Sequence, residues 1–139
     1  MANIFPFLQP EAVIKDTALP LAREIKWDRE NNAPVFSGGV PVIVTGREAV
    51  LTWAWKALHT ERYRWPIYTW DYGCEARSLI GQAYTEELKE SEAARCVREC
   101  LTINPYITGV SDVDTAFSDG GLTINCRIVT IYGEEELHV

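Results

Sequence analysis

Residues 60 to 73 read Thr60-Glu-Arg-Tyr-Arg-Trp-Pro-Ile-Tyr-Thr-Trp-Asp-Tyr-Gly73, and this aromatic stretch separates two segments with helical patterns. Pro66 lacks a backbone N–H and favours an extended conformation at the residue before it, so a helix cannot continue through the stretch. Gly73 permits a positive φ and a sharp turn into the next element. We therefore expect a long aromatic loop, either tied down over a small core or offered to a partner.

Length and composition indicate one soluble domain. The chain has 139 residues, of which 47% are hydrophobic and 24% are charged, and this is enough to bury a core without metal or disulfide support. The net charge of -7 argues against a general nucleic-acid binder or a binder of anionic membranes, which need clustered basic groups. We find neither a membrane-spanning apolar run nor a signal-peptide pattern, so we expect a protein made and kept in a cytoplasm.

Four cysteines stand at 74, 96, 100 and 126, without the Cys-x-x-Cys spacing of zinc or redox sites. Cys96 and Cys100 share one face of an expected helix with Ala93, Val97 and Leu101, which is the spacing of a core face. The pattern predicts buried free thiols and neither a metal site nor a cofactor site.

The chain before the aromatic stretch divides at about residue 25. Residues 1–25 mix apolar patches with three prolines, which indicates an extended N-terminal arm lying on its own domain or on a partner. Residues 26–139 form the expected single domain. It begins with short strands at 26–28, 33–36 and 40–44 and a helix from about 47 to 59, and Thr45-Gly-Arg-Glu48 has the pattern of a capping box.

The sequence after the aromatic stretch predicts two further helices and then two strands. A short helix is expected at 75–80, and a longer one, capped by Thr85, runs to about Leu101. Alternation predicts strands at 110–117 and 122–132 around a hairpin turn at 118–121, before a short acidic end at 133–139. The fold class is α+β, with helices packed on a small, mostly antiparallel sheet.

The sequence supports a catalytic role less well than a binding role. His59 follows the expected helix as a helix-terminal histidine would, and no Ser or Cys nucleophile motif accompanies it. Glu61, Asp71 and Glu75 lie near tryptophans, as in a glycosidase cleft, so a small cell-wall hydrolase using a carboxylate pair stays an alternative.

An ordered series of short runs resembles the XkdS-like tail proteins of phages and defective prophages, and through them the sheath-initiator family of contractile tails. The runs begin at Thr45 (Thr-Gly-Arg-Glu-Ala), Lys56 (Lys-Ala-Leu-His-Thr-Glu-Arg-Tyr-Arg) and Ile67 (Ile-Tyr-Thr-Trp-Asp-Tyr-Gly). Others follow at Ser78, Asn104 and Thr130, so the resemblance covers roughly residues 26–133. The wider family has a Glu-Pro-Arg turn where this chain has Asn104-Pro105-Tyr106, so both charged partners are missing here.

The resemblance implies a structural, non-enzymatic component of a contractile phage tail or tail-like particle, placed in the baseplate between the wedge and the first sheath ring. Its expected partners are other wedge proteins and the tail sheath protein, with the tail hub or tube as further candidates. Nucleic acid, membrane and small-molecule substrates are not expected. The residues expected to hold or brace these contacts are Arg62, Tyr63, Arg64, Trp65, Tyr68, Trp70, Tyr72, Asn104, Pro105, Tyr106, Val129 and Ile131. The hairpin with the long 122–132 strand is expected to face the sheath through an open edge, guarded by the acidic residues 134–136, and the loop at 60–73 is expected to face the wedge.

Overall fold

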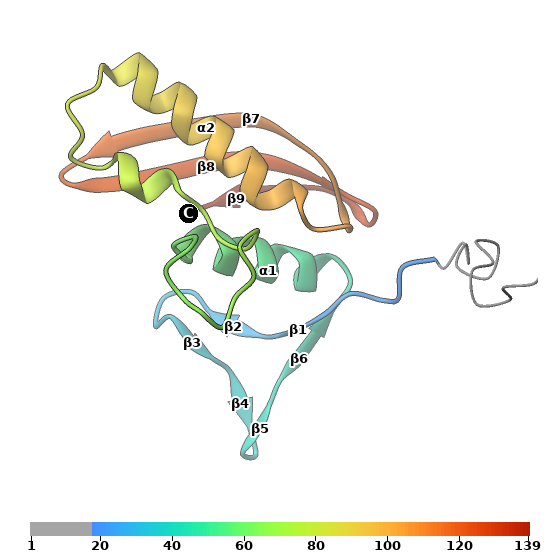
Figure 1. Cartoon of the computed structure of the whole chain (residues 1–139). Coiled ribbons are helices and arrows are strands. Elements are labelled where there is room, and N and C mark those ends of the chain that lie inside the picture. The colour runs from blue at the N-terminus through green and yellow to red at the C-terminus, as the bar shows by residue number, and fades with distance from the viewer. Residues whose placement is uncertain (1–17) are drawn as a thin grey trace, which may run out of the picture.

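The structure, a computed structural model, describes residues 18–139, and it confirms the α+β fold class (Figure 1). Six short strands precede helix α1, a single turn of 3-10 helix η3 precedes helix α2, and three longer strands follow. The elements are β1 (Arg23–Ile25), β2 (Trp27–Asp28), β3 (Ala33–Pro34), β4 (Phe36–Ser37), β5 (Val40–Pro41), β6 (Ile43–Thr45), α1 (Arg47–His59), η3 (Ala76–Leu79), α2 (Glu86–Thr102), β7 (Ile107–Ser118), β8 (Gly121–Thr130) and β9 (Gly133–His138).

The six short strands form three antiparallel pairs, β1–β6, β2–β3 and β4–β5, which meet at one junction. There Lys26, Val35 and Val42 close a ring of backbone hydrogen bonds. Lys26 donates to Val42 at 2.7 Å, while Val42 donates to Val35 and Val35 donates to Lys26, each at 2.9 Å. The β4–β5 hairpin projects away from both helices (Figure 1). The expected strand at 40–44 is therefore divided at Val42, where the chain passes from one pair to the next.

Helix α1 has the expected bounds, but the predicted capping box is wrong. The N-cap is Gly46, at φ 63°, and no side chain caps the helix. Thr45 instead pairs with Arg23 as the last residue of β6. Since its backbone is held in that ladder, its hydroxyl is not placed over the first turn of the helix.

Helix α2 begins as predicted, because the Thr85 hydroxyl accepts a hydrogen bond from the Leu88 N–H at 3.3 Å. The expected apolar face is buried, which confirms the spacing argument. Its residues are Ala93, Cys96, Val97, Cys100 and Leu101.

The three-stranded sheet has the order β7–β8–β9. The predicted hairpin turn is confirmed, with Asp119 at φ 49° and Gly120 at φ 72° between β7 and β8. The prediction of a short acidic end after Gly133 is wrong, because these residues form β9. Leu137 pairs with Cys126 and is only 1% exposed, so a single inward apolar residue anchors an otherwise acidic strand.

The core lies where the two helices meet this sheet, with α2 alongside β7 and α1 near β9 (Figure 1). Its largest fully buried side chains are Val50, Val97, Leu101, Ile128 and Leu137. Among residues 18–139, neither helix has the length and apolar character needed to cross a membrane.

The greater part of the expected N-terminal arm, residues 1–17, lies outside the described residues. The arm's last residues belong to the domain's own ladders, since β1 pairs with β6 and Ala22 is buried. The proposed boundary at residue 25 thus falls at the end of β1, which places a strand of the domain within the expected arm.

Candidate protein-interaction surfaces

The aromatic loop, residues 60–73, is closed at its base by backbone contacts. Cys74 N–H donates to the Thr60 carbonyl at 2.8 Å, and Glu61 and Cys74 form an isolated bridge. Gly73 has φ +108°, and a Cβ there would lie 2.9 Å from backbone atoms of Arg62 and Thr60. Only glycine fits this close approach, so the sequence prediction for Gly73 is confirmed.

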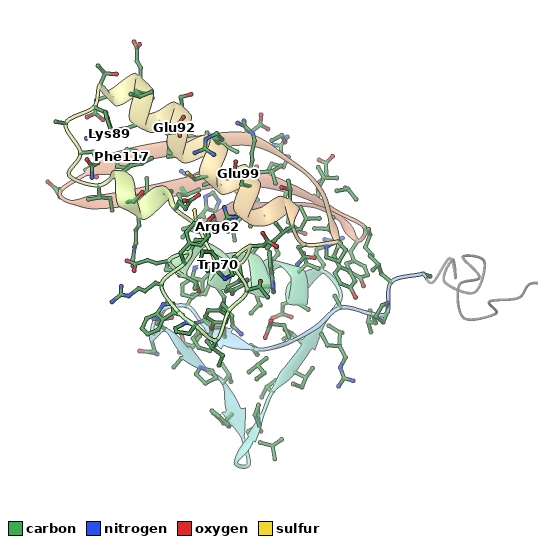
Figure 2. The ribbon with its side chains drawn as sticks, in the orientation of Figure 1. Arg62, Trp70, Lys89, Glu92, Glu99 and Phe117 are labelled. Carbon is green, nitrogen blue, oxygen red and sulfur yellow. The ribbon has the colours of Figure 1, made fainter. Side chains whose placement is uncertain are left out.

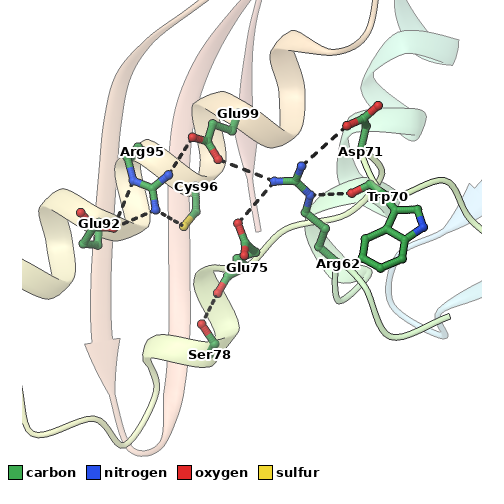
Figure 3. A network of polar contacts seen from close by, with 9 residues as sticks. All are labelled: Arg62, Trp70, Asp71, Glu75, Ser78, Glu92, Arg95, Cys96 and Glu99. Atoms are coloured by element: carbon green, nitrogen blue, oxygen red, sulfur yellow. Dashed lines mark hydrogen bonds and ion pairs between the residues drawn. The ribbon is translucent and has the colours of Figure 1, made fainter.

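Arg62 braces the loop from within (Figure 3). Its Nε donates to the Trp70 carbonyl at 2.8 Å, across the width of the loop. Its terminal nitrogens lie 3.3 Å from a Glu75 carboxylate oxygen, 3.7 Å from one of Glu99 and 3.8 Å from one of Asp71. The side chain is only 19% exposed and its contacts brace the loop, while partner binding by Arg62 stays a prediction.

The same network continues along α2. Glu99, which approaches Arg62, also accepts a hydrogen bond from Arg95 at 2.7 Å, and Arg95 reaches Glu92 at 2.9 Å (Figure 3). The hydrogen bonds that Arg95 donates to Glu92 and Glu99 raise the pKa of Arg95. The loop is therefore connected to the helix through charge-assisted hydrogen bonds.

Tyr72 forms the second internal brace. Its ring meets Trp53 of α1 edge to face, with centroids 5.8 Å apart, and it lies 4.6 Å from the ring of Tyr68. Burial raises the pKa of Tyr72 to about 12. Tyr72 thus anchors the loop on α1.

The remaining large side chains of the loop face outward and form what we call the aromatic surface. Ile67 is 86% exposed and Trp70 79% exposed; Figure 2 labels Trp70 at the front of the loop. Tyr63, Trp65 and Tyr68 complete the surface, each about half exposed. A cavity of about 340 Å³ opens there, lined by Tyr63, Arg64, Trp65, Pro66, Tyr68, Thr69 and Trp70. The Arg64 guanidinium lies 5.0 Å from the centre of the Trp65 ring and pairs with Glu61.

The turn at 104–106 is occupied by contacts within the chain. Asn104 is buried, and its side-chain oxygen accepts the Tyr106 N–H at 2.9 Å. The Tyr106 hydroxyl donates to the Pro20 carbonyl at 2.7 Å, and its ring stacks on that of Tyr132. Pro105 is exposed at the rim of a cavity of about 310 Å³ between this turn, β1 and α1. Partner binding by these residues stays a prediction, and only Pro105 among them is free of such an internal role.

The free edge expected at 122–132 is not there. β8 is the central strand, so Val129 pairs with Gly109 of β7 on one side and with Glu134 of β9 on the other. Ile131 follows the strand, is 48% exposed, and donates its N–H to the Tyr106 carbonyl at 3.0 Å. The reason for the error is that β9 was expected to be an acidic tail.

The carboxylates considered for hydrolysis are each held by an arginine. Glu61 pairs with Arg64, while Asp71 and Glu75 both pair with Arg62. His59 Nδ1 lies 2.8 Å from the Trp55 carbonyl, in the last turn of α1. Within residues 18–139, we find no group of three His, Cys, Asp or Glu side chains arranged to hold a metal ion.

The four thiols are free and buried, as predicted for Cys96 and Cys100. Burial raises the pKa of Cys96 and of Cys126 to about 11. The hydrogen bond between Cys74 and Cys100, together with burial, raises the pKa of Cys100. These groups belong to the core.

Some exposed apolar residues were not predicted. Ile67 belongs to the aromatic surface, and Phe36, Val40 and Ile43 are exposed on the projecting hairpin and β6. The turn Gly38-Gly39 predicts the hairpin. The exposure of the hairpin's apolar residues, however, follows from the junction of the three strand pairs, which the sequence pattern does not reveal.

Two comparisons with known proteins agree. A family model for the contractile injection system sheath initiator matches residues 23–133, most of the chain. The chain belongs to the sheath-initiator family. It is also 32% identical over 96 residues to the phage-like element PBSX protein XkdS of Bacillus subtilis (strain 168), and the match covers 68% of each chain.

Membership makes the protein a structural component of a contractile tail, and it confirms the resemblance seen in the sequence. A sheath initiator acts with the tail sheath and with baseplate components, and its family is a structural one. The match begins at the first residue of β1 and ends at the first residue of β9, so it includes the aromatic loop.

Proposed function

We propose that this sheath initiator, made in the host cytoplasm, sits in the tail baseplate and joins the wedge to the first sheath ring. The wedge-facing side is the aromatic surface of loop 60–73. The observation that carries this assignment is the concentration of five large apolar side chains, 46% to 86% exposed, on one loop. Arg62 and Tyr72 hold the loop in place in the free protein, so the loop should lose little conformational entropy when a partner binds.

Exposed aromatics with neighbouring arginine have the composition of interface hot spots. Clustered apolar exposure of this kind marks an interaction site more often than a chance feature of a monomer. The hydrolase alternative gains no support, since each of its three carboxylates pairs with an arginine of the loop, Glu61 with Arg64 and the other two with Arg62. The proposal therefore assigns binding, without catalysis, to this surface.

The sheath-facing side is the outer edge of β9, where an incoming strand would extend the sheet. Strand addition uses backbone groups at an open edge. Ile124 and Val139 exchange both backbone hydrogen bonds at 2.8 Å, so the alternation of an antiparallel ladder directs the N–H groups of Glu134, Glu136 and His138 outward.

β9 is better suited to this role than β7, the other edge strand. The pairing of β7 with β8 shifts register between Ile107 and Gly109 and again between Ser111 and Asp114. Bulges of this kind protect an edge from pairing. β9 pairs with β8 without a shift from Gly133 to His138, and exposed Glu134 and Glu136 would favour a basic partner strand.

The wedge assignment is tested by co-purification with co-expressed wedge proteins. Trp65→Ala combined with Trp70→Ala removes two exposed rings and should reduce capture at least tenfold while the variant stays folded. Tyr84→Ala, which removes a ring of similar exposure outside the loop, is the matched control. Undiminished capture by the double variant would place the wedge contact elsewhere.

The sheath assignment is tested with Glu136→Pro, which removes one outward N–H and leaves the β8–β9 ladder intact. Baseplates carrying this variant should assemble but fail to start sheath polymerisation. Glu136→Gln keeps the N–H and serves as control for the lost charge. If Glu136→Pro baseplates grow sheath normally, the strand does not add at β9.

A further inference from the structure

The base of the aromatic loop brings two cysteines together. Cys74 follows Gly73, and its N–H donates to the Thr60 carbonyl at 2.8 Å, which closes the loop. Cys100 belongs to α2, and its thiol donates a hydrogen bond to the sulfur of Cys74. Both thiols are free. Because a disulfide can form only between cysteines that already lie close together, this pair meets its first requirement.

The contacts around the two cysteines join the same two elements. The Arg62 N–H donates to the Cys74 carbonyl at 3.5 Å, and the Arg62 guanidinium lies 3.3 Å from Glu75, the residue after Cys74. The same guanidinium lies 3.7 Å from Glu99, the residue before Cys100 (Figure 3). Neighbours of both cysteines thus meet on one arginine, which holds the loop base against α2.

Cys74 is the thiol of the pair that is suited to react first. It lines a cavity of about 390 Å³, whose walls include Arg62, Arg64 and Arg77. The hydrogen bond from Cys100, helped by the positive charge of Arg62, lowers the pKa of Cys74 against the opposing effect of burial. A cysteine with thiolate character, beside positive charge and next to a second thiol, has the surroundings of a redox-sensitive cysteine.

Cys96 and Cys126 lack this combination. Burial raises the pKa of each to about 11, so both stay protonated at neutral pH. Cys126 also lines a cavity, of about 160 Å³, but no other cysteine contributes to its pKa. These two thiols therefore serve as internal references for the reactivity of Cys74.

We propose that a hydroperoxide oxidises Cys74 and that Cys100 then completes a disulfide, which ties the base of the aromatic loop to α2. In the first step the Cys74 sulfur attacks one peroxide oxygen, the O–O bond breaks, and one water leaves as Cys74 becomes a sulfenic acid. In the second step the Cys100 sulfur attacks the Cys74 sulfur, the S–O bond breaks, and a second water leaves. Two thiols lose two electrons and two protons, and one hydrogen peroxide is reduced to two waters.

The disulfide would close a ring from residue 74 to residue 100, and a closed ring of this length restricts the unfolded chain. Oxidised protein should therefore melt at a higher temperature than reduced protein. The inference concerns the free protein and does not depend on which surface meets the wedge. It can fail while the wedge assignment stands, and the reverse.

The test treats the full-length protein with hydrogen peroxide, alkylates the remaining thiols in denaturant, and maps the peptides by mass spectrometry without reductant. Digestion with trypsin and an Asp-specific protease puts each cysteine on its own peptide, at residues 71–77, 96–98, 99–111 and 119–127. We expect 71–77 joined to 99–111 within the monomer, at a rate at least tenfold above the oxidation of Cys96 or Cys126. Dithiothreitol should separate the two peptides and reverse the rise in melting temperature.

Cys100→Ser removes the second thiol, so the sulfenic acid on Cys74 should persist and be labelled by dimedone on residues 71–77. Cys96→Ser, at a buried position one turn away on α2, is the matched control and should leave the disulfide unchanged. The peptide map of the unsubstituted protein decides the matter even if Cys100→Ser fails to fold. A Cys74 that oxidises no faster than Cys126, a link from Cys74 to Cys96, or links found only between chains would overturn the proposal. A linked protein that melts no higher than the reduced one would overturn the tie between the loop and α2.

Discussion

Tyr106 and Tyr132 stack almost parallel, with ring centroids 6.3 Å apart, and their hydroxyl groups hold the same stretch of backbone. The Tyr106 hydroxyl donates to the Pro20 carbonyl at 2.7 Å, and the Tyr132 hydroxyl accepts from the Ala22 N–H at 3.0 Å. Two residues from the far end of the chain thus fix the point where the N-terminal residues join the domain.

Tyr132→Phe removes the acceptor of the Ala22 N–H and keeps the stacked ring. We expect a loss of about 0.5–1.5 kcal/mol in the free energy of unfolding, the usual net value of one hydrogen bond. Hydrogen exchange at the Ala22 amide should accelerate with it. Tyr84→Phe, at an exposed site, is the control, and an unchanged Ala22 amide would contradict the described geometry.

Arg62→Lys should loosen the aromatic loop. Lysine cannot reproduce the planar fork that reaches the Trp70 carbonyl and the Glu75 and Glu99 carboxylates together. We expect a loss of about 1–2 kcal/mol, since hydrogen bonds to charged groups carry more than neutral ones. Chemical denaturation measures it. Arg64→Lys changes an exposed pair and should cost less than about 0.5 kcal/mol.

Gly73→Ala should destabilise the fold more than Gly81→Ala does. Both residues have positive φ, so both variants carry the strain of a non-glycine residue there, of order 1–3 kcal/mol. Only at Gly73 does the new Cβ also collide with backbone, at 2.9 Å, whereas space is open at Gly81. Equal melting temperatures for the two variants would mean that the loop base is not closed as described.

The sequence predicted elements whose signals are local. The Thr85 cap, the apolar face of α2 and the turn at Asp119-Gly120 depend on residues a few positions apart, and all three are confirmed. β9 was missed because Glu134 to Glu136 suit a solvated tail, and only pairing with β8 makes Leu137 a core residue.

The candidate surface was predictable in position but not in detail. Its composition marks residues 60–73 for binding, yet nothing in the local pattern separates Trp70, which faces outward, from Tyr72, which packs on Trp53. The inward role of Arg62 depends on Glu99, which is 37 positions away in the chain. Which loop residues pack inward and which face outward is therefore decided by the tertiary structure.

The free energy of unfolding should fall as the pH rises from about 8.5, the pKa of an ordinary cysteine thiol, to about 11. Burial raises the pKa of Cys96 and Cys126 to about 11, so unfolded thiols ionise while folded ones keep their protons. The unfolded state then binds fewer protons than the native state, and stability decreases with pH across this window. Cys126→Ala should flatten the decrease measured by urea denaturation. An unchanged slope would mean that Cys126 reaches solvent.

Thr85 and Thr45 each precede a helix and look alike in sequence, but they should respond differently to alanine. The Thr85 hydroxyl accepts the Leu88 N–H, so Thr85→Ala should cost about 1 kcal/mol of unfolding free energy. Thr45 makes no cap bond to α1, since Gly46 is the N-cap, and its backbone pairing with Arg23 does not need the side chain. Thr45→Ala, at an exposed strand position, should change stability by less than about 0.5 kcal/mol. Thermal and urea unfolding of the two variants measure the difference. A larger loss for Thr45→Ala would show that its hydroxyl caps α1 after all, as the capping-box pattern predicts.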